Sequence, residues 1–564
     1  MNASTSHQRF LCGTLLSLVI QGFAWSAEPP LQGLWLMGQS LCEGAESLPL
    51  VSTKPSTWGN LSFERGVRTW TYGDHHTTPQ ERPKEGFRFV PLQAGVSGGT
   101  GETIANGLAD HLKATLPGDA TQAAASPHYL VAYAGQGGRG IEELSVADQV
   151  RDPRTPEVKH RGGGNYATSV DDARRAVAQA RSVGKEFAIK ALVWMQGEAN
   201  GGPTGGIVPS RWEAELPSPA GQEWYRDRLV DYRKQWSDDL RGATGQAGEI
   251  PMFTYQTLGA AGQAQLMAAD ADPHLYMVGP HYMVPSAINS RYKGRYGEGI
   301  HLSADGERWY GEQVAKVVRR VLVEKEDWQP LRPQRAVLAN NGTQIRIDFI
   351  VPRPPLAIDE ADLPRQQSGT GDEAGYTSLA GFQYRNQAGA VVMLKEARVI
   401  PPTQVLLTLA TPQPSGATGT LSYGLPHLGE LGVIAFVRPG PAEKGQPTTD
   451  IVVSGTRLAS LQPLVNEGTF YVANSLAPPA AARAPVRQLK EEGEALVIRI
   501  ENRELREGVT FVAGQKISAY RAFSFGNLRD SDPEKAIYAF GDAEYGARHG
   551  QPYPLWNWCV LFNR

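Results

Sequence analysis

Cysteine is scarce in this chain, with three among 564 residues. Cys12 lies in an apolar N-terminal segment, so the remainder contains only Cys42 and Cys559 and can form at most one internal disulfide. In an oxidising compartment that disulfide would tie the N-terminal part of the chain to its C-terminus. The alternative is two buried thiols, since free cysteine is among the most buried residue types. Sequence alone does not place the two Cα atoms within bridging range, so both alternatives stay open.

The chain also lacks an excess of charge and long apolar runs. It has 55 Lys and Arg against 58 Asp and Glu, a formal net charge of -3. No Lys/Arg cluster resembles a nucleic-acid-binding surface, so we expect no nucleic-acid partner. No apolar segment is long enough to span a bilayer, and no internal repeat of fixed period is present. Nothing in the sequence indicates an oligomeric state.

The first residues have the pattern of a signal peptide. His7 and Arg9 precede an apolar run from Leu15 to Phe23. The following Ala24-Trp25-Ser26 offers small residues at the two positions that a signal peptidase reads. We therefore expect residues 1–26 to be a signal peptide, cleaved after Ser26 or Ala27, and the mature chain to be exported to the periplasm or the extracellular space.

The length predicts more than one domain, because 564 residues exceed what one hydrophobic core usually organises. Between residues 28 and 328, short apolar runs alternate with amphipathic helical stretches, which is typical of an α/β domain with a parallel sheet. We expect strands near residues 34–37, 128–133, 187–195, 251–255 and 276–278. Ser303 suits the N-cap of the last helix, which carries an apolar stripe at Tyr310, Val314, Val317 and Val321.

The pattern changes after Pro330. Residues 345–351, 404–409 and 495–501 alternate apolar and polar side chains with a period of two, and turn residues separate them. Residues 329–564 are therefore predicted to form a β-rich region of the sandwich type. The stretch Ala477 to Pro485, rich in Pro and Ala, looks like a linker or the boundary of an insertion.

Two glycine-containing segments follow predicted strands, at the edge where open α/β sheets bind ligands. In Gly38-Gln39-Ser40, the serine can present its hydroxyl and its backbone N–H to a substrate. The loop from Gly135 to Glu143 can aim N–H groups at a developing oxyanion. Alone, each is weak: the serine suits a turn or a cap, and the loop suits a flexible turn. A phosphate loop is a further alternative, although its Lys and Ser/Thr are missing.

Two further segments carry candidate functional side chains. Gln196 offers an amide that can donate to an oxyanion, and Glu198 either acts as an acid or, as we prefer, orients the loop through backbone N–H groups. Glu298 lies three residues before His301, so its carboxylate can bind Nδ1 and leave Nε2 free to accept a proton from serine. A lone histidine at a helix start is usually structural. The chain order of serine, amide loop and carboxylate–histidine pair is more specific than any one segment.

Together these blocks resemble the SGNH hydrolases, and within them the sialate O-acetylesterase-like and acetylxylan-esterase-like carbohydrate esterases. That group shows a GQSN block, a two-glycine loop followed by Ile and acidic residues, a W-x-Q-G-E-x-D block and a D-x-x-H block. Here the blocks are Gly38–Leu41, Gly137–Ile141, Trp194–Asn200 and Glu298–His301. Gly526–Ser531 and Leu555–Cys559 are similar to the tail of these proteins. The resemblance covers most of the chain, with residues 428–520 fitting worst as a candidate insertion.

The resemblance implies a fold and an activity. The fold is a flavodoxin-like, three-layer SGNH-hydrolase domain with a parallel sheet over residues 28–328, followed by the C-terminal β-sandwich region. The activity is that of a serine esterase that removes O-acetyl groups from acetylated carbohydrate through an acyl-serine, with no metal and no cofactor. The implied roles are nucleophile for Ser40, general base for His301, its carboxylate for Glu298, oxyanion donors for Ser40, Gly137, Gly138 and Gln196, and loop orientation for Gln39 and Glu198.

Three positions depart from the family pattern. Leu41 replaces the usual Asn, which puts in doubt any hydrogen bond made beside the nucleophile. Asn200 replaces the usual Asp. Glu298 replaces the usual Asp with an arm one methylene longer, so its contact with His301 needs a different geometry.

Other readings stay open from the sequence alone. The same fold can act on lipid or aryl esters, or bind carbohydrate without turnover. A glycosidase using Glu198 and Glu298 is a third alternative, which requires a carboxylate separation of about 5–9.5 Å. The 12 Trp and 20 Tyr offer sugar-stacking platforms, although most will be core residues. Arg139 and Arg295 either meet an acidic sugar or are solvated loop cations.

Overall fold

The computed structural model describes most of the chain after the N-terminal segment. The described residues are 31–70, 82–96, 101–116, 126–146, 164–201, 207, 220–287, 301–361, 363, 367–368, 375–425, 427–443, 445–454, 470–474, 484–502, 510–521, 525–541 and 547–564. The predicted signal peptide at 1–26, Arg295 and Glu298 lie outside them. No helix in these ranges is long and apolar enough to cross a membrane.

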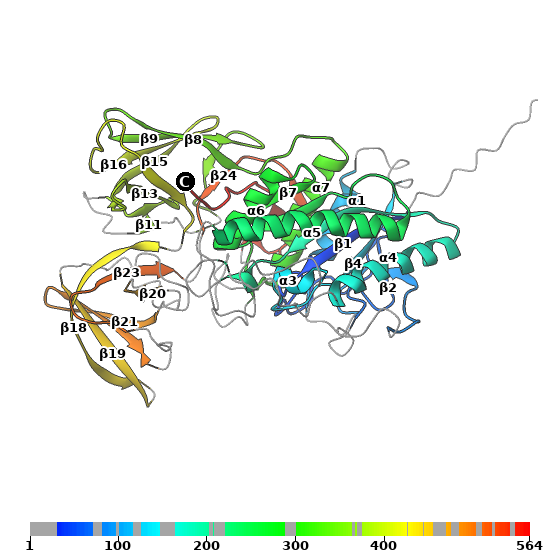
Figure 1. Cartoon of the computed structure of the whole chain (residues 1–564), viewed down its shortest axis with the longest axis horizontal. Coiled ribbons are helices and arrows are strands. Elements are labelled where there is room, and N and C mark those ends of the chain that lie inside the picture. The colour runs from blue at the N-terminus through cyan, green and yellow to red at the C-terminus, as the bar shows by residue number, and fades with distance from the viewer. Residues whose placement is uncertain are drawn as a thin grey trace, which may run out of the picture.

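A seven-stranded sheet forms the centre of the N-terminal unit (Figure 1). Its strand order is β3-β2-β4-β1-β5-β6-β7, and every neighbouring pair is parallel except β2 with β3. Five neighbouring strands, β4-β1-β5-β6-β7, have the order 2-1-3-4-5 when they are numbered along the chain, which is the order of flavodoxin-like sheets. The strands are β1 (Leu31–Gly38), β2 (Leu61–Phe63), β3 (Phe89–Pro91), β4 (His128–Tyr133), β5 (Phe187–Met195), β6 (Met252–Gln256) and β7 (Leu275–Pro280).

Helices cover both faces of this sheet, so the unit has three layers. Successive β1 residues alternate between the two cores: Leu34 packs with α1 and α7, and Trp35 packs with α4 and α5. The Ser303 side chain accepts from the Gly306 N–H at 3.1 Å, and so caps α7 as predicted. The helices are α1 (Ile104–Ala114), α3 (Ile141–Leu144), α4 (Gly164–Ser182), the short η1 (Glu198–Asn200), α5 (Ala220–Thr244), α6 (Ala260–Ala271) and α7 (Ala304–Leu322).

Two antiparallel sheets with one shared core form a sandwich after α7. In β9, Ile345, Ile347 and Phe349 face that core and the residues between them face outward, as their period of two predicts. One sheet contains β11 (Gln367–Ser368), β12 (Ser378–Leu379), β13 (Phe382–Asn386), β14 (Val391–Val392), β17 (Gly419–Tyr423) and β27 (Phe562–Asn563). The other contains β8 (Arg332–Ala339), β9 (Gln344–Ile350), β15 (Leu394–Ile400) and β16 (Gln404–Leu409).

A separate barrel lies between β17 and the end of the chain, and Figure 1 shows it as a lobe of its own. Its six strands close in the order β18-β19-β22-β21-β20-β23 around their own core. The sequence predicted sandwich strands here, because alternation indicates one buried face but not whether the last strand pairs with the first. The strands are β18 (His427–Glu443), β19 (Gln446–Ser454), β20 (Phe470–Ala473), β21 (Ala484–Glu492), β22 (Ala495–Glu501) and β23 (Lys516–Arg521).

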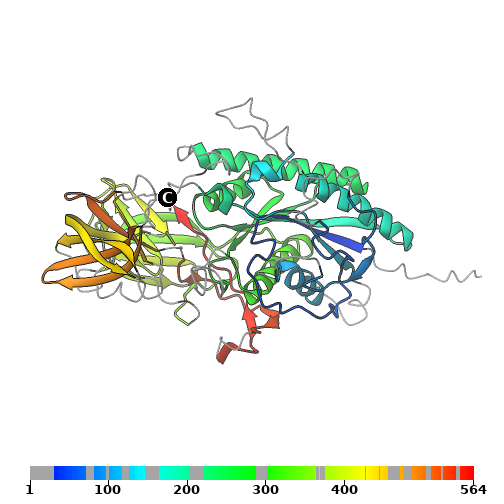
Figure 2. The ribbon, with the colours of Figure 1, turned by 90° about the horizontal axis from the view of Figure 1, so that it is seen from below.

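The C-terminal segment returns to the α/β unit, where Figure 2 shows its strands beside the green helices. Tyr553, Leu555 and Trp558 belong to the same core as α1 and α7. The predicted domain boundary at residue 328 does not include this return, because it depends on contacts across more than 200 positions. The strands of this segment are β24 (Leu528–Arg529), which pairs with β10 (Ala357–Ile358), and β25 (Lys535–Ala539), which pairs with β26 (Pro552–Pro554).

Cys42 and Cys559 are both free and buried, so the alternative of two buried thiols describes this structure. Cys42 packs in the core under α1 and α7, whereas Cys559 packs in the core of the sandwich. Burial raises the pKa of both thiols well above their ordinary value.

Candidate active site

Ser40 lies on a tight turn at the carboxyl end of β1. The Glu43 N–H donates to the Gln39 carbonyl at 3.1 Å and the Ala45 N–H donates to the Ser40 carbonyl at 3.0 Å, which closes a single helical turn. The turn begins at Gly38, where a Cβ atom would lie 2.1 Å from the Met195 carbonyl oxygen, so only glycine fits.

Leu41, which stands where the family pattern has Asn, is 1% exposed. Its side chain packs in the same hydrophobic core as α1 and α7, which fixes the turn to that core. The position therefore contributes packing, and no polar side chain follows the nucleophile.

The Ser40 hydroxyl and the Ser40 N–H both make no hydrogen bond with any other residue that the structure describes. Gly137 of the glycine loop packs directly against this serine, since a Cβ atom on Gly137 would lie 3.6 Å from the Ser40 Cβ. The structure thus brings together two of the four predicted segments, the serine turn and the glycine loop.

The structure distinguishes between the two glycines that were candidates for an oxyanion donor, Gly137 and Gly138. The Gly137 N–H donates to the Glu43 carboxylate at 2.9 Å, so it is already satisfied. The Gly138 N–H has no partner among the described residues, and the left-handed φ of 71° at Gly138 favours glycine. Gly138, and not Gly137, is the glycine that can donate to an oxyanion.

His301 is held against the Ser40 turn from the other side. Its Nδ1 lies 3.0 Å from Oε2 of Glu46, and the next residue, Leu302, accepts from the Ser47 hydroxyl at 2.7 Å. The predicted partner Glu298 lies outside the described residues, so Glu46 is the carboxylate that the structure places at Nδ1. Ser40 and His301 make no direct hydrogen bond, a contact that in many enzymes forms only when substrate is bound.

Gln39 connects the Ser40 turn to the loop after β5. Its side-chain oxygen accepts from the Gly197 N–H at 3.2 Å and from the Ala199 N–H at 3.0 Å. These two bonds hold the third predicted segment beside the nucleophile.

Gln196 has a different role from the predicted one. Its amide nitrogen donates to the Arg139 carbonyl at 3.1 Å and to Asn200 Oδ1 at 2.7 Å, while its oxygen accepts from the Tyr225 hydroxyl at 2.6 Å. The side chain is 0% exposed. Both N–H groups of the Gln196 amide therefore already have partners inside the protein. The sequence predicted that this amide donates to an oxyanion, but in the structure it connects Arg139 of the glycine loop to Asn200.

The hydrogen bonds of Asn200 give a reason for asparagine in place of the usual aspartate. Its oxygen accepts from the Ile141 N–H at 2.9 Å as well as from Gln196, as an aspartate could. Its amide nitrogen, however, donates to Glu142 Oε2 at 3.0 Å, which an aspartate could not do. Asn200 and Glu142 are thus a matched pair that joins two loops of the site.

The sequence predicted that Glu198 bonds to backbone N–H groups. In the structure its carboxylate accepts hydrogen bonds from two hydroxyl side chains, Tyr255 of β6 and Thr257 just after β6. The Tyr255 hydroxyl donates to both carboxylate oxygens at 2.6 and 2.7 Å, and the Thr257 hydroxyl also donates. Burial raises the pKa of Glu198, although the bonds from Thr257 and Tyr255 and the charge of His301 oppose that rise. His301 therefore lies within electrostatic range of a second carboxylate.

His281, at the end of β7, was not predicted. Its Nε2 lies 4.0 Å from Glu198 Oε1, and neither ring nitrogen has a hydrogen-bond partner among the described residues. Burial lowers the pKa of His281 to about 4, so the ring is neutral at ordinary pH. No group of three or more His, Cys, Asp or Glu side chains within the described ranges is placed to hold a metal ion.

Sequence reasoning also missed Glu43 and Glu46. They follow Ser40 by three and six residues, within the turn that the structure forms after the serine. That spacing was the available signal. The spacing is informative only if the residues after Ser40 form a turn, and the sequence alone did not distinguish a turn from an extended loop.

No family model and no curated protein matches this sequence. Among solved structures, a carbohydrate acetylesterase from Xanthomonas citri is similar at 14% identity with a TM-score of 0.43, covering 70% of this chain and 75% of that one. NanS is similar at 15% identity with a TM-score of 0.34, covering 53% and 99%. Est24, a carbohydrate acetylesterase from Sinorhizobium meliloti, is similar at 12% identity with a TM-score of 0.24, covering 51% and 99%. These TM-scores, all below 0.5, assign neither a family nor an activity to the chain.

Proposed function

We propose that this chain is an exported serine esterase of the SGNH-hydrolase type that removes O-acetyl groups from carbohydrate. One observation carries the proposal: a single turn bears Ser40 and, through Glu46, holds His301. A second observation supports the proposal: the turn follows the carboxyl end of β1, and parallel sheets with the strand order of β4-β1-β5-β6-β7 bind ligands outside the carboxyl ends of their strands. The sequence blocks described above supply the family and the acetylated-carbohydrate substrate.

The proposed reaction begins with attack of Ser40 Oγ on the ester carbonyl carbon, while Nε2 of His301 accepts the hydroxyl proton. The N–H groups of Ser40 and Gly138 receive the resulting oxyanion. The bond between the carbonyl carbon and the sugar oxygen then breaks, and that oxygen takes the proton from His301 to become a hydroxyl, which leaves an acetyl-serine. Water, activated by His301, then hydrolyses the acetyl-serine and releases acetate.

Glu46 supports the base in this scheme. Its carboxylate at Nδ1 favours the tautomer with Nε2 unprotonated, and stabilises the imidazolium that forms during the attack. Activity should fall in acid, because a protonated imidazole accepts no further proton. Glu198 contributes a second negative charge near His301.

Release of acetate tests the proposal. Wild type, Ser40→Ala and His301→Ala are assayed on 4-nitrophenyl acetate and on a panel of acetylated glycans. Ser182→Ala and His274→Ala, at two exposed positions outside the site, serve as matched controls. We expect both site variants to lose activity and both controls to retain it; wild-type turnover in either site variant would overturn the assignment.

A fluorophosphonate probe separates the enzyme from its main alternative, a carbohydrate-binding protein on the same fold. The esterase should label at Ser40, and Ser40→Ala should not. A folded wild-type protein that binds acetylated glycans and never labels would favour the binding protein. Turnover of long-chain lipid esters in preference to acetylated sugars would favour the lipid-esterase alternative.

The proposal of export depends on residues 1–26. N-terminal sequencing of the protein recovered from the cell envelope or the medium checks it. A mature N-terminus at Ala27 or Glu28 is the expected result, and an intact Met1 on recovered active protein would contradict it.

A further inference from the structure

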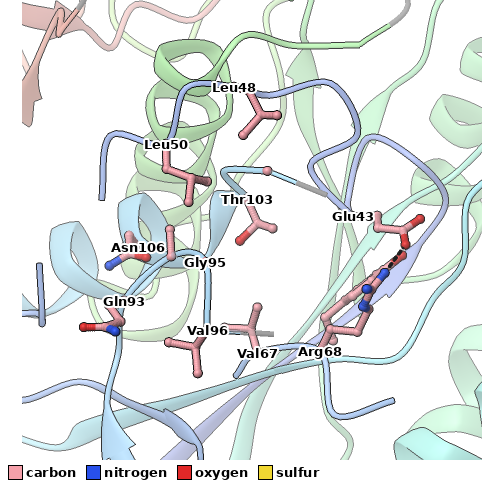
Figure 3. Close-up of a pocket in the computed structure, with 13 residues that line it drawn as sticks. Glu43, Leu48, Leu50, Val67, Arg68, Gln93, Gly95, Val96, Thr103 and Asn106 are labelled. Carbon is pink, nitrogen blue, oxygen red and sulfur yellow. Dashed lines mark hydrogen bonds and ion pairs between the residues drawn. The ribbon is translucent and has the colours of Figure 1, made fainter. Parts of the chain in front are cut away.

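A pocket lies directly beside the turn that carries Ser40, and no step of the proposed reaction uses it (Figure 3). Its volume is about 180 Å³. At about 30 Å³ for each water molecule, the space equals about six waters, which suits one sugar ring. Its walls come from five parts of the chain: the residues after Ser40, residues 67–68, residues 93–96, residues 101–106 at the start of α1, and Tyr133 at the end of β4.

One side of the pocket is apolar and the other offers amides. Leu48, which is 47% exposed, and Leu50 form an apolar rim. Asn106, only 3% exposed, and Gln93 also line the pocket, and neither side chain hydrogen-bonds to another described residue. The Asn106 amide is therefore available to hydrogen-bond with a ligand that enters the pocket.

The charges at the pocket cancel. Glu43 and Arg68 form an ion pair with side chains 2% and 4% exposed, and Figure 3 shows the pair on the side away from Asn106 and Gln93. Arg68 also lies over the Trp70 ring, 5.0 Å from its centroid. Among the described residues that line the pocket, Glu43 and Arg68 are the charged ones, and they are paired with each other. The pocket offers apolar surface, two amides and the Thr103 hydroxyl.

Glu43 joins the pocket to the candidate active site. It lies three residues after Ser40 on the same helical turn, and its Oε2 accepts the Gly137 N–H at 2.9 Å. Gly137 in turn packs against Ser40. Glu43 therefore contacts the pocket on one side and the glycine loop beside Ser40 on the other.

From this geometry we infer that the pocket binds an uncharged sugar ring, the unit that carries or adjoins the acetyl ester. The inference rests on the proposed esterase function and names its substrate class. Amides donate and accept hydrogen bonds, as sugar hydroxyls do, and an apolar rim suits the C–H face of a ring. An acidic sugar would bring a carboxylate, and Arg68, the one cationic side chain of the described lining, is already paired to Glu43.

A pocket-filling variant tests the inference. Val96 is partly buried at the rim, so Val96→Trp adds bulk where the ring would lie. The probes are an O-acetylated methyl glucoside, the matching O-acetylated methyl glucuronide and 4-nitrophenyl acetate. We expect kcat/KM on the glucoside ester to fall about tenfold or more in Val96→Trp, and kcat/KM on 4-nitrophenyl acetate to stay within about twofold.

Two further variants sharpen the comparison. Asn106→Leu removes the buried amide at similar volume and should raise KM for the glucoside ester about 2- to 10-fold, the effect of one lost hydrogen bond. Val183→Trp, at a 52% exposed position outside the pocket, is the matched control and should change neither substrate. Equal loss on both substrates in Val96→Trp, or no loss on either, would overturn the inference. So would a preference of the wild type for the glucuronide.

Binding separates this inference from the proposed function. Saturation-transfer NMR measures the binding of methyl glucoside to the wild type and to Val96→Trp. This sugar carries no ester, so the measurement involves no turnover. If the wild type hydrolyses no ester, the proposed function fails, and binding that Val96→Trp abolishes still supports a neutral sugar pocket. Absence of glucoside binding to folded wild type overturns the pocket whether or not esters are hydrolysed.

Discussion

Oε2 of Glu46 lies 3.0 Å from Nδ1 of His301, although 255 positions of sequence separate the two residues. Glu46 adopts a left-handed backbone with φ of 63°, which is uncommon for a residue other than glycine. This carboxylate comes from the turn of the nucleophile, whereas the predicted partner, Glu298, lies outside the described residues. One turn positions both the attacking group and the partner of the base.

Replacing Glu46 by glutamine should lower kcat about tenfold with little change in KM. The amide oxygen can still accept from Nδ1, but it lacks the charge that stabilises the imidazolium, and a tenfold effect corresponds to about 1.4 kcal/mol in the barrier. Steady-state kinetics on 4-nitrophenyl acetate measures the change, with Glu494→Gln as an exposed control. An unchanged kcat would indicate that Glu198, the other carboxylate near His301, stabilises the imidazolium instead of Glu46.

Gly138→Ala and Gly184→Ala form a matched pair. Both glycines have φ of 71°, and at both an added Cβ would meet nothing within 4 Å. Each substitution should cost about 1 kcal/mol of stability through backbone strain. Only Gly138→Ala should also reduce kcat, by about 100-fold, because it displaces the N–H that receives the oxyanion. Equal kcat values in the two variants would remove Gly138 from the oxyanion site.

Asn200→Asp should destabilise the protein, and Glu142→Gln should rescue it. The aspartate would face the Glu142 carboxylate at a contact that is now a 3.0 Å hydrogen bond, so we expect a loss of about 1–3 kcal/mol. In the double variant, the glutamine amide can donate to the new aspartate. Chemical denaturation of the two single variants and the double variant measures this coupling. Additive losses would show that the two residues do not act as a pair.

His111 should make the attachment of the C-terminal segment depend on pH. Its ring is fully buried between Glu312, 2.7 Å from Nδ1, and Glu534, 3.0 Å from Nε2. Burial opposes the charged ring, but the hydrogen bonds to both carboxylates outweigh it and raise the pKa of His111. Burial also raises the pKa of Glu312, so this pair retains its proton as the pH rises.

A raised pKa means that the folded state binds the proton more tightly than the unfolded chain does. The stabilisation by His111 is therefore complete below its ordinary value of 6.5 and is lost as the pH rises through the folded value. His111→Asn should cost about 3–5 kcal/mol of unfolding free energy near pH 6 and less near pH 9. Denaturation of both proteins at the two pH values measures the difference, and a cost that grows with pH would contradict the prediction.

Cys42 and Cys559 should both resist thiol reagents in the folded protein. Each is 0% exposed, and burial raises the pKa of each thiol, so little thiolate is available. Alkylation with peptide mapping should modify neither residue under native conditions, and both after unfolding without reductant. A Cys42–Cys559 peptide that appears only without reductant would show that the disulfide alternative is correct.

Local patterns were sufficient for much of the framework. The strands near residues 34–37, 128–133 and 187–195, and the helix capped by Ser303, lie where periodicity and capping predicted them, because side-chain alternation and N-caps depend on near neighbours. Local sequence also identified the serine turn and the glycine loop. It could not assign the donors of that loop, since only the fold brings Glu43 to the Gly137 N–H.

By itself, the sequence determined the elements, the order of layers and the segments that meet at the edge of the sheet. Only the tertiary structure decided the partner of His301, the brace made by Gln196, the closing of the barrel and the return of the C-terminal segment to α7. Each of these depends on a contact between residues far apart in sequence. Such contacts follow from how the layers pack together, and no local periodicity encodes them.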